Sequence, residues 1–140
     1  MILDDSPDLL DALRIFLEQE SFVVCTVSTI EFLKTELKRF NPGIIILDVY
    51  IHGHADGRAI CKIIKSDIKT RHIPVLLMSV SKRELERFEE CKADAIIEKP
   101  FDLSDLLKKI RTLSRVNIET IITDNMNESH RLNSLMTKNA

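Results

Sequence analysis

The stretch "IIILDVYIHGHADGRAI", residues 44–60, contains the pattern that decides the fold. Four apolar residues are followed directly by a carboxylate, Asp48, and then by a loop that carries Gly53 and Gly57. A continuous apolar run is typical of a central strand in a parallel sheet, because helices cover both faces of such a sheet. A carboxylate at the carboxyl end of that strand faces a crevice, which is where open α/β proteins bind their ligands.

Strand patterns and helix patterns alternate on both sides of this stretch. Strands are predicted at residues 1–3, 22–27, 44–47, 75–79 and 95–98. Each is followed by a segment in which apolar residues recur at helical spacing, and the fourth of these helices is predicted over residues 81–91. Strict alternation with buried strands predicts an α/β fold, in which a parallel sheet is covered by helices on both faces.

The length of 140 residues suits one domain with one core. We expect this domain over residues 1–113, followed by a polar tail over 114–140 that is part helical or disordered, with one short helix near 128–136. The tail is too short and too polar for a second core, so we expect no DNA-binding effector domain in it. The first strand has only three residues before Asp4, which leaves open a truncation at the N-terminus.

Composition narrows the class of protein. The net charge of −2 gives no basic field for nucleic acid or for an anionic membrane, and no apolar run is long enough to span a bilayer. The cysteines, Cys25, Cys61 and Cys91, are odd in number and far apart. They fit neither a disulfide framework nor a zinc site, and they favour a cytoplasmic location.

Polar residues follow four of the five predicted strands. Asp4 and Asp5 follow the first, Asp48 the third, Ser79 the fourth and Lys99 the fifth. Clustered carboxylates repel one another unless a cation joins them, and Mg²⁺ prefers such oxygen ligands. A hydroxyl and an ammonium group beside the cation would complete a cradle for a phosphoryl group. An aspartate can also accept that group as an acyl phosphate.

These motifs resemble the receiver domain of bacterial two-component response regulators, over roughly residues 1–113. The resemblance rests on "LDD", "IILD", "DG", "PVLLMSV" and "ADAIIEKPF", which stand in the family's order. Each motif is weak by itself, whereas the ordered set is specific. The resemblance implies a flavodoxin-like, doubly wound sheet of five parallel strands in the order 2-1-3-4-5.

The resemblance also implies the roles of the polar residues. Asp48 would accept phosphate from a histidine kinase or a phosphotransfer protein. Asp5 and Asp48 would bind Mg²⁺ together with the backbone carbonyl of Tyr50, and Asp4 would act through water. The chain would then be a phosphoacceptor with self-catalysed phosphotransfer and dephosphorylation, and not an enzyme acting on separate substrates.

Ser79 and Lys99 would complete the site in the resembling family. Ser79 would follow the phosphoryl group, and Lys99 would pair with that group or with Asp48. A cis bond between Lys99 and Pro100 would turn the lysine into the site. Phosphorylation would switch the binding of a downstream protein. The chain could also form a homodimer.

The sequence departs from the family pattern near the site. His52 stands where a proline is usual, in a loop with an extra residue, and Val80 replaces the usual alanine after Ser79. The loop between Ser79 and Lys99 is shortened. Ile96 replaces the aromatic switch residue, so the usual inward rotation of a ring cannot operate. We expect the downstream partner to bind on the face around Ile96.

Two alternatives come from other classes of protein. A pseudo-receiver, which binds proteins without being phosphorylated, is favoured by Ile96 and by the altered loop. The intact acidic, hydroxyl and lysine positions argue against it. A phosphatase with an aspartyl nucleophile would need a second acid two residues after Asp48, and Tyr50 occupies that position.

Overall fold

The computed structural model describes residues 1–52 and 55–138, and its centre is one five-stranded parallel sheet. The strands lie in the order β2-β1-β3-β6-β7, with β1 at Ile2–Leu3, β2 at Thr26–Val27, β3 at Ile45–Asp48, β6 at Val75–Ser79 and β7 at Ala95–Glu98. This order is the predicted 2-1-3-4-5, because β4 and β5 belong to a separate hairpin that lies between β3 and β6 in the sequence. The predicted α/β fold is confirmed.

The second strand is shorter than the prediction over residues 22–27. Only Thr26 and Val27 pair with β1, which is itself two residues long. The chain leaves the preceding helix through Ser21 in the left-handed region, and the N–H of Phe22 donates to the carbonyl of Leu17 at 3.0 Å. Phe22, Val24 and Cys25 therefore pack beside the core instead of extending the sheet, whereas Val23 is exposed.

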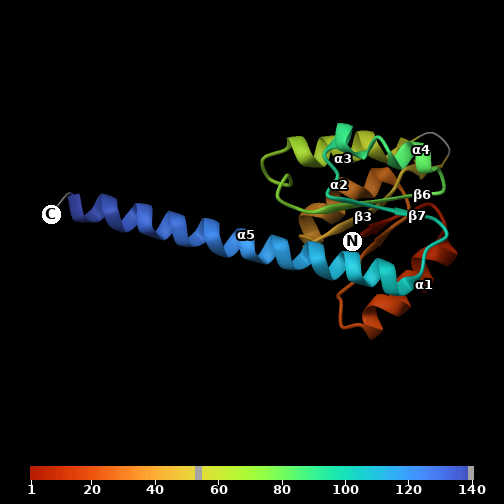
Figure 1. The fold of residues 1–140 in the computed structure, drawn as a ribbon, viewed down its shortest axis with the longest axis horizontal. Helices are drawn as coiled ribbons and strands as arrows, with labels where there is room; N and C mark the ends of the chain where they lie inside the picture. Colours follow the sequence, from red (N-terminus) through yellow and green to blue (C-terminus); the bar gives the residue numbers. More distant parts are fainter. Residues whose placement is uncertain (53–54, 139–140) are drawn as a thin grey trace.

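Helices cover both faces of the sheet. Figure 1 shows α2, α3 and α4 on one side and α1 and α5 on the other. Their bounds are α1 at Pro7–Gln19, α2 at Ile30–Phe40, α3 at Gly57–Ser66, α4 at Lys82–Leu85 and α5 at Leu103–Lys138. Each side has its own apolar cluster: α2 and α3 bury Leu33, Ile60 and Ile64, whereas α1 and α5 bury Leu10, Leu13, Leu106 and Ile110.

The helix predicted over residues 81–91 is divided in two. α4 ends at Leu85, and the short 3₁₀ helix η1 covers Phe88–Cys91. Phe88 and Cys91, three residues apart, both pack against the core. That spacing matches the three residues per turn of a 3₁₀ helix, so tighter winding keeps both side chains on the buried face.

The last helix continues far beyond the sheet. α5 runs without a break from Leu103 to Lys138, and Figure 1 shows its second half leaving the domain. Instead of a short helix near residues 128–136, one helix covers the whole segment. No glycine or proline follows Pro100, so no residue type in the segment ends the helix. The division into a domain at 1–113 and a tail at 114–140 stays a prediction. In the described part of the chain, no helix is both long and apolar enough to cross a membrane.

Candidate functional site

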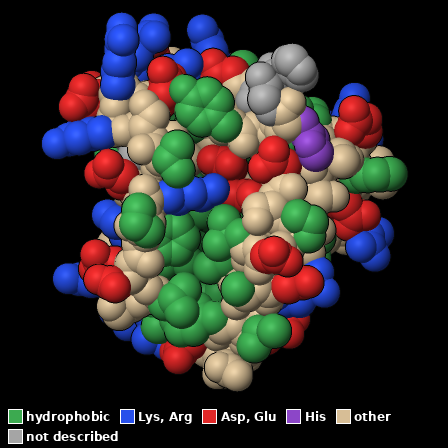
Figure 2. Space-filling model, turned by 90° about the vertical axis from the view of Figure 1, so that its right-hand side faces the viewer, with side chains coloured by type: hydrophobic (Ala, Val, Ile, Leu, Met, Phe, Trp, Pro, Cys, Tyr) green, Lys and Arg blue, Asp and Glu red, His purple; other side chains and the backbone are tan. Residues whose placement is uncertain are grey.

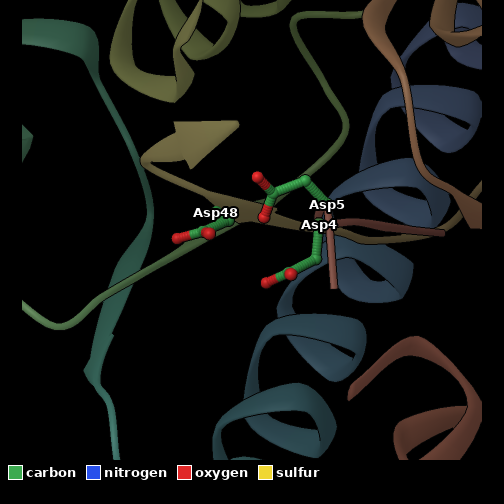
Figure 3. Close-up of side chains that lie close together, drawn as sticks. All are labelled: Asp4, Asp5 and Asp48. Carbon is green, nitrogen blue, oxygen red and sulfur yellow. The ribbon is translucent and has the colours of Figure 1, made fainter. Parts of the chain in front are cut away.

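The predicted acidic residues meet at the carboxyl edge of the sheet. Asp48 is the last residue of β3 and is buried, and Asp4 and Asp5 directly follow β1. Oxygen atoms of these three carboxylates all lie within 4.8 Å of one another. Figure 3 shows the three side chains turned to the same side. The structure thus brings together the residues that the sequence predicts for a metal site.

Lys99 provides the positive charge of the cluster. Its bond to Pro100 is cis, as the resemblance implied. Its Nζ lies 2.6 Å from Oδ2 of Asp4 and 3.2 Å from Oδ2 of Asp48. One ammonium group therefore faces two buried carboxylates, and the third carboxylate lies nearby, so the site keeps an excess of negative charge.

The electrostatics of Asp48 follow from this arrangement. Burial raises the pKa of its carboxyl group, and the neighbouring Asp4 raises it further. Lys99 and the backbone N–H of Tyr50 lower the pKa, but they do not offset burial. A divalent cation at this position would favour the ionised carboxylate, which is the nucleophilic form.

Ser79 stands on the other side of Asp48, at the end of β6. It is fully buried, and its Oγ accepts a hydrogen bond from the N–H of Ser81 at 3.1 Å. The carbonyl of Ser79 also accepts from the N–H of Lys99 at 2.8 Å. The hydroxyl and the ammonium group are therefore carried by two backbone segments that are hydrogen-bonded to each other. Val80 is 70% exposed at the rim.

The "DG" motif, Asp56 and Gly57, packs against the backbone of Asp48. Asp56 caps α3 by accepting a hydrogen bond from the N–H of Arg58, and Gly57 begins the helix. A Cβ at Gly57 would lie 2.0 Å from the carbonyl oxygen of Asp48, so only glycine allows this approach. The N–H of Gly57 donates to the carbonyl of Val49 at 2.8 Å. Helix α3 is thereby held against the end of β3.

A short antiparallel hairpin follows Asp48, and the sequence patterns missed it. Its strands are β4 at Tyr50–Ile51 and β5 at Ala55–Asp56, and residues 53–54 between them lie outside the described part. The backbone N–H of His52, just after β4, donates to Oδ2 of Asp5 at 2.8 Å. The sequence marks His52 only as a departure from a family pattern, and periodicity cannot detect a two-residue strand.

Figure 2 looks onto this edge of the molecule. Acidic side chains gather near the centre of the face beside a basic side chain, and hydrophobic side chains lie next to them. The acidic cluster thus lies at an outer face of the molecule, at the carboxyl edge of the sheet.

Comparison with known proteins identifies the family. The family model for the response regulator receiver domain matches residues 1–111. The chain belongs to this family. It is 31% identical over 117 residues to the heme response regulator HssR of Staphylococcus epidermidis, covering 82% of this chain and 50% of the relative. It is 28% identical over 119 residues to the DNA-binding dual master transcriptional regulator RpaA of Synechocystis, covering 82% of this chain and 48% of the relative.

Solved structures agree with this assignment. The signal receiver domain of a signal transduction histidine kinase from Syntrophus aciditrophicus is 30% identical, with a TM-score of 0.74, and the match covers 81% of this chain and 87% of that one. NtrX from Brucella abortus shares the fold, with a TM-score of 0.79 at 20% identity over 90% of this chain and 29% of that one. The chain spans about half the length of the curated relatives it matches.

Membership of the family establishes the general role. This chain is a receiver domain of two-component signalling, and the pseudo-receiver alternative is not favoured. Receiver domains bind Mg²⁺ at an acidic pocket, and the structure has an acidic cluster formed by Asp4, Asp5 and Asp48. Its donors are all carboxylate oxygens, which suit a hard divalent cation.

Proposed function

We propose that Asp48 is the phosphoacceptor of this receiver domain. The observation that carries the proposal is its position: a buried carboxylate at the end of β3, 3.2 Å from the ammonium group of Lys99 and within 4.8 Å of two further carboxylates. A nucleophile held on a strand end is aimed by the sheet and not by a flexible loop, which favours an in-line approach to phosphorus.

We propose Mg²⁺ as the cation of the site. Asp5 and Asp48 would hold it with the backbone carbonyl of Tyr50. Asp4 would act through water, because its Oδ2 already accepts from Lys99 at 2.6 Å and its Oδ1 from the N–H of Ser6 at 2.8 Å. When bound, the cation would offset the repulsion between these carboxylates and an incoming phosphoryl group.

The residues of this chain then perform the transfer. An oxygen of Asp48 attacks the phosphorus of a phosphohistidine or of a small phosphodonor. A P–O bond forms while the bond from phosphorus to the leaving nitrogen or oxygen breaks, and the leaving group keeps the electron pair. The Ser79 hydroxyl and the Lys99 ammonium group stabilise the negative charge on the phosphoryl oxygens. Water later hydrolyses the acyl phosphate, so phosphotransfer and dephosphorylation are both self-catalysed.

The partners follow from this chemistry. The donor would be a histidine kinase or a phosphotransfer protein in the cytoplasm. The downstream protein would bind on the Ile96 face, meaning the surface of β7 and α4 around Ile96. Ile96 is half-buried against the core and has no ring to rotate. Phosphorylation should therefore disturb the segment after Ser79 and α4 more than it moves Ile96.

Two relatives bear on the assembly. RpaA carries DNA binding in its name, but this chain matches only 48% of it, and we propose no nucleic-acid or membrane contact for this chain alone. A beryllofluoride-activated receiver domain of NtrC4, 22% identical to this chain, was solved as a dimer. A homodimer of the phosphorylated chain is therefore a specific alternative to a monomer.

Labelling with acetyl phosphate and Mg²⁺ tests the proposal. Mass spectrometry should find one phosphoryl group per chain, lost in alkali, and Asp48→Asn should abolish it. Asp11→Asn, an exposed acid on α1, is the matched control and should be labelled like the wild type. Lys99→Ala should weaken partner binding more than labelling.

Binding of Mg²⁺ can be followed without phosphate. Tyr50 is the single tyrosine and the chain has no tryptophan, so intrinsic fluorescence reports from the proposed site itself. Mg²⁺ should change this emission and raise the melting temperature of the wild type, but do neither in Asp5→Asn. Equal labelling of Asp48→Asn and wild type, or no labelling of the wild type with any donor, would return the chain to the pseudo-receiver class.

A further inference from the structure

His52 makes contacts that connect the hairpin to the acidic cluster. Its backbone N–H donates to Oδ2 of Asp5 at 2.8 Å, although the two residues are 47 positions apart. Its imidazole Nδ1 is 3.9 Å from the same oxygen, which is too long for a hydrogen bond. The hydrogen bond to Asp5 therefore comes from the main chain of His52 and not from its ring.

The ring of His52 forms a hydrogen bond with a different residue, Ser28. Nε2 lies 3.0 Å from the backbone carbonyl of Ser28, in the turn between β2 and α2. A carbonyl oxygen only accepts, so Nε2 carries the proton and donates. The ring therefore ties the end of β4 to this turn, next to the end of β1 where Asp5 stands.

The conformation of His52 makes this arrangement incompatible with proline. Its φ is 51°, in the left-handed region, whereas the proline ring restricts φ to about −65°. Proline also has no N–H to donate. Histidine adopts the left-handed region more often than most residues, and a glycine or asparagine would also fit. A proline, the usual residue of the resembling family at this position, can supply neither the conformation nor the hydrogen bond.

We propose that His52 is a positioning residue for Asp5, which orients this carboxylate for the cation through its backbone N–H. The inference rests on the proposed Mg²⁺ site. Asp5 is the most exposed of the three acids, with 34% of its side chain accessible. Without a partner it would sample several rotamers, whereas a hydrogen bond to Oδ2 restricts the carboxylate and leaves Oδ1 for the metal. The imidazole acts indirectly, because its hydrogen bond to the Ser28 carbonyl holds the backbone of His52 in place.

Three substitutions separate the main chain from the ring. His52→Pro removes the N–H and the left-handed conformation. His52→Gly keeps both and removes only the ring, and His52→Asn keeps both with a smaller polar side chain. His72, an exposed histidine in the loop before β6, provides the matched control His72→Gly.

The Kd for Mg²⁺, read from Tyr50 fluorescence and from calorimetry, is the decisive measurement. A hydrogen bond to a charged group corresponds to about tenfold in affinity, so His52→Pro should weaken binding about tenfold. His52→Gly should weaken it by roughly threefold or less, and His52→Asn should restore most of that loss. His72→Gly should match the wild type.

Labelling kinetics separate positioning from general damage. In His52→Pro, the Mg²⁺ concentration that gives half-maximal labelling by acetyl phosphate should rise by a larger factor than the maximal rate falls. If His52→Pro does not fold, the amide proton of His52 in the wild type serves instead. Its NMR resonance should be protected from exchange and should shift in Asp5→Asn.

The outcomes distinguish this inference from the proposed function. A wild-type affinity in a folded His52→Pro, or a His52 amide that exchanges freely and ignores Asp5→Asn, would overturn the role of His52 alone. A wild-type protein that binds no Mg²⁺ would instead overturn the proposed site.

Discussion

The interior of the sheet and its carboxyl edge are built from neighbouring residues of the same strands, but burial of these residues has opposite effects on stability. Leu47 and Leu77 in β3 and β6 are completely buried among apolar side chains. One or two residues further along, Asp48 and Ser79 are buried almost as deeply but are polar. Burial of the leucines stabilises the fold, because it removes apolar surface from water. Burial of a carboxylate destabilises it unless a partner compensates.

The difference teaches that this edge is not optimised for stability. Asp48 shares one lysine with Asp4, and burial still raises its pKa. Strained or charged groups of this kind persist in a fold only when the surrounding structure holds them. The interior of the sheet supplies that support. Substitution of a buried leucine and substitution of Asp48 should therefore have effects of opposite sign.

The largest effect is expected in the interior. Leu47→Ala removes a fully buried side chain from the central strand, so it should lower the free energy of unfolding by about 2–5 kcal/mol. Urea denaturation measures this value. Leu103→Ala, at a side chain that is 43% exposed, is the control and should cost much less. Equal losses in the two variants would contradict the assignment of the core.

The next effect concerns the contact between α3 and β3. Gly57→Ala places a Cβ 2.0 Å from the carbonyl oxygen of Asp48, and the backbone must shift to relieve the overlap. We expect a loss of about 1–3 kcal/mol, together with slower labelling by acetyl phosphate, because Asp48 moves with its carbonyl. Gly43→Ala is the matched control, since a Cβ there meets nothing within 4 Å. If both alanine variants are equally stable, the close approach is not real.

A smaller effect, with the opposite sign, is expected at the edge. The raised pKa of Asp48 means that this group favours folding below its unfolded pKa and loses that contribution as the pH rises through its folded pKa. Asp48→Asn should therefore raise the free energy of unfolding at pH 7 without Mg²⁺, by on the order of 1 kcal/mol. The gain should shrink as the pH falls towards about 4, the pKa of an unfolded aspartate. If Asp48→Asn is less stable than the wild type at pH 7, burial of the Asp48 carboxylate does not destabilise the fold.

The smallest effect is expected in the part of α5 that extends beyond the sheet. Ile122 in the second half of α5 is 53% exposed, whereas Ile110 in the first half is buried. Ile122→Ser should change the free energy of unfolding by no more than about 0.5 kcal/mol, and Ile110→Ala should lower it by about 2–5 kcal/mol. A large loss in Ile122→Ser would show that the second half of α5 is buried in solution, for example in a homodimer.

The sequence predicted the fold well where the local pattern of apolar residues determines whether a segment forms a strand or a helix. The apolar run before Asp48 and the five polar residues at strand ends were recognisable because parallel strands place their carboxyl ends at one edge. The prediction was less accurate where strand pairing or packing against other elements determines the secondary structure. Residues 22–25 have a strand pattern but lack a long partner strand, and residues 82–91 divide into α4 and η1 because Phe88 and Cys91 must share one face.

By itself, the sequence determined the alternation of the five sheet strands with helices and the types of residue at the site, since both follow from local periodicity and from chain order. Only the tertiary structure decided which of these groups touch. The 2.6 Å contact between Lys99 and Asp4 joins residues 95 positions apart, and the contact between His52 and Asp5 joins residues 47 apart. Such contacts depend on the direction of a loop, set in this chain by a left-handed residue after β4, and on the packing beneath it. Neither property repeats along the chain, so no pattern of apolar residues could reveal it.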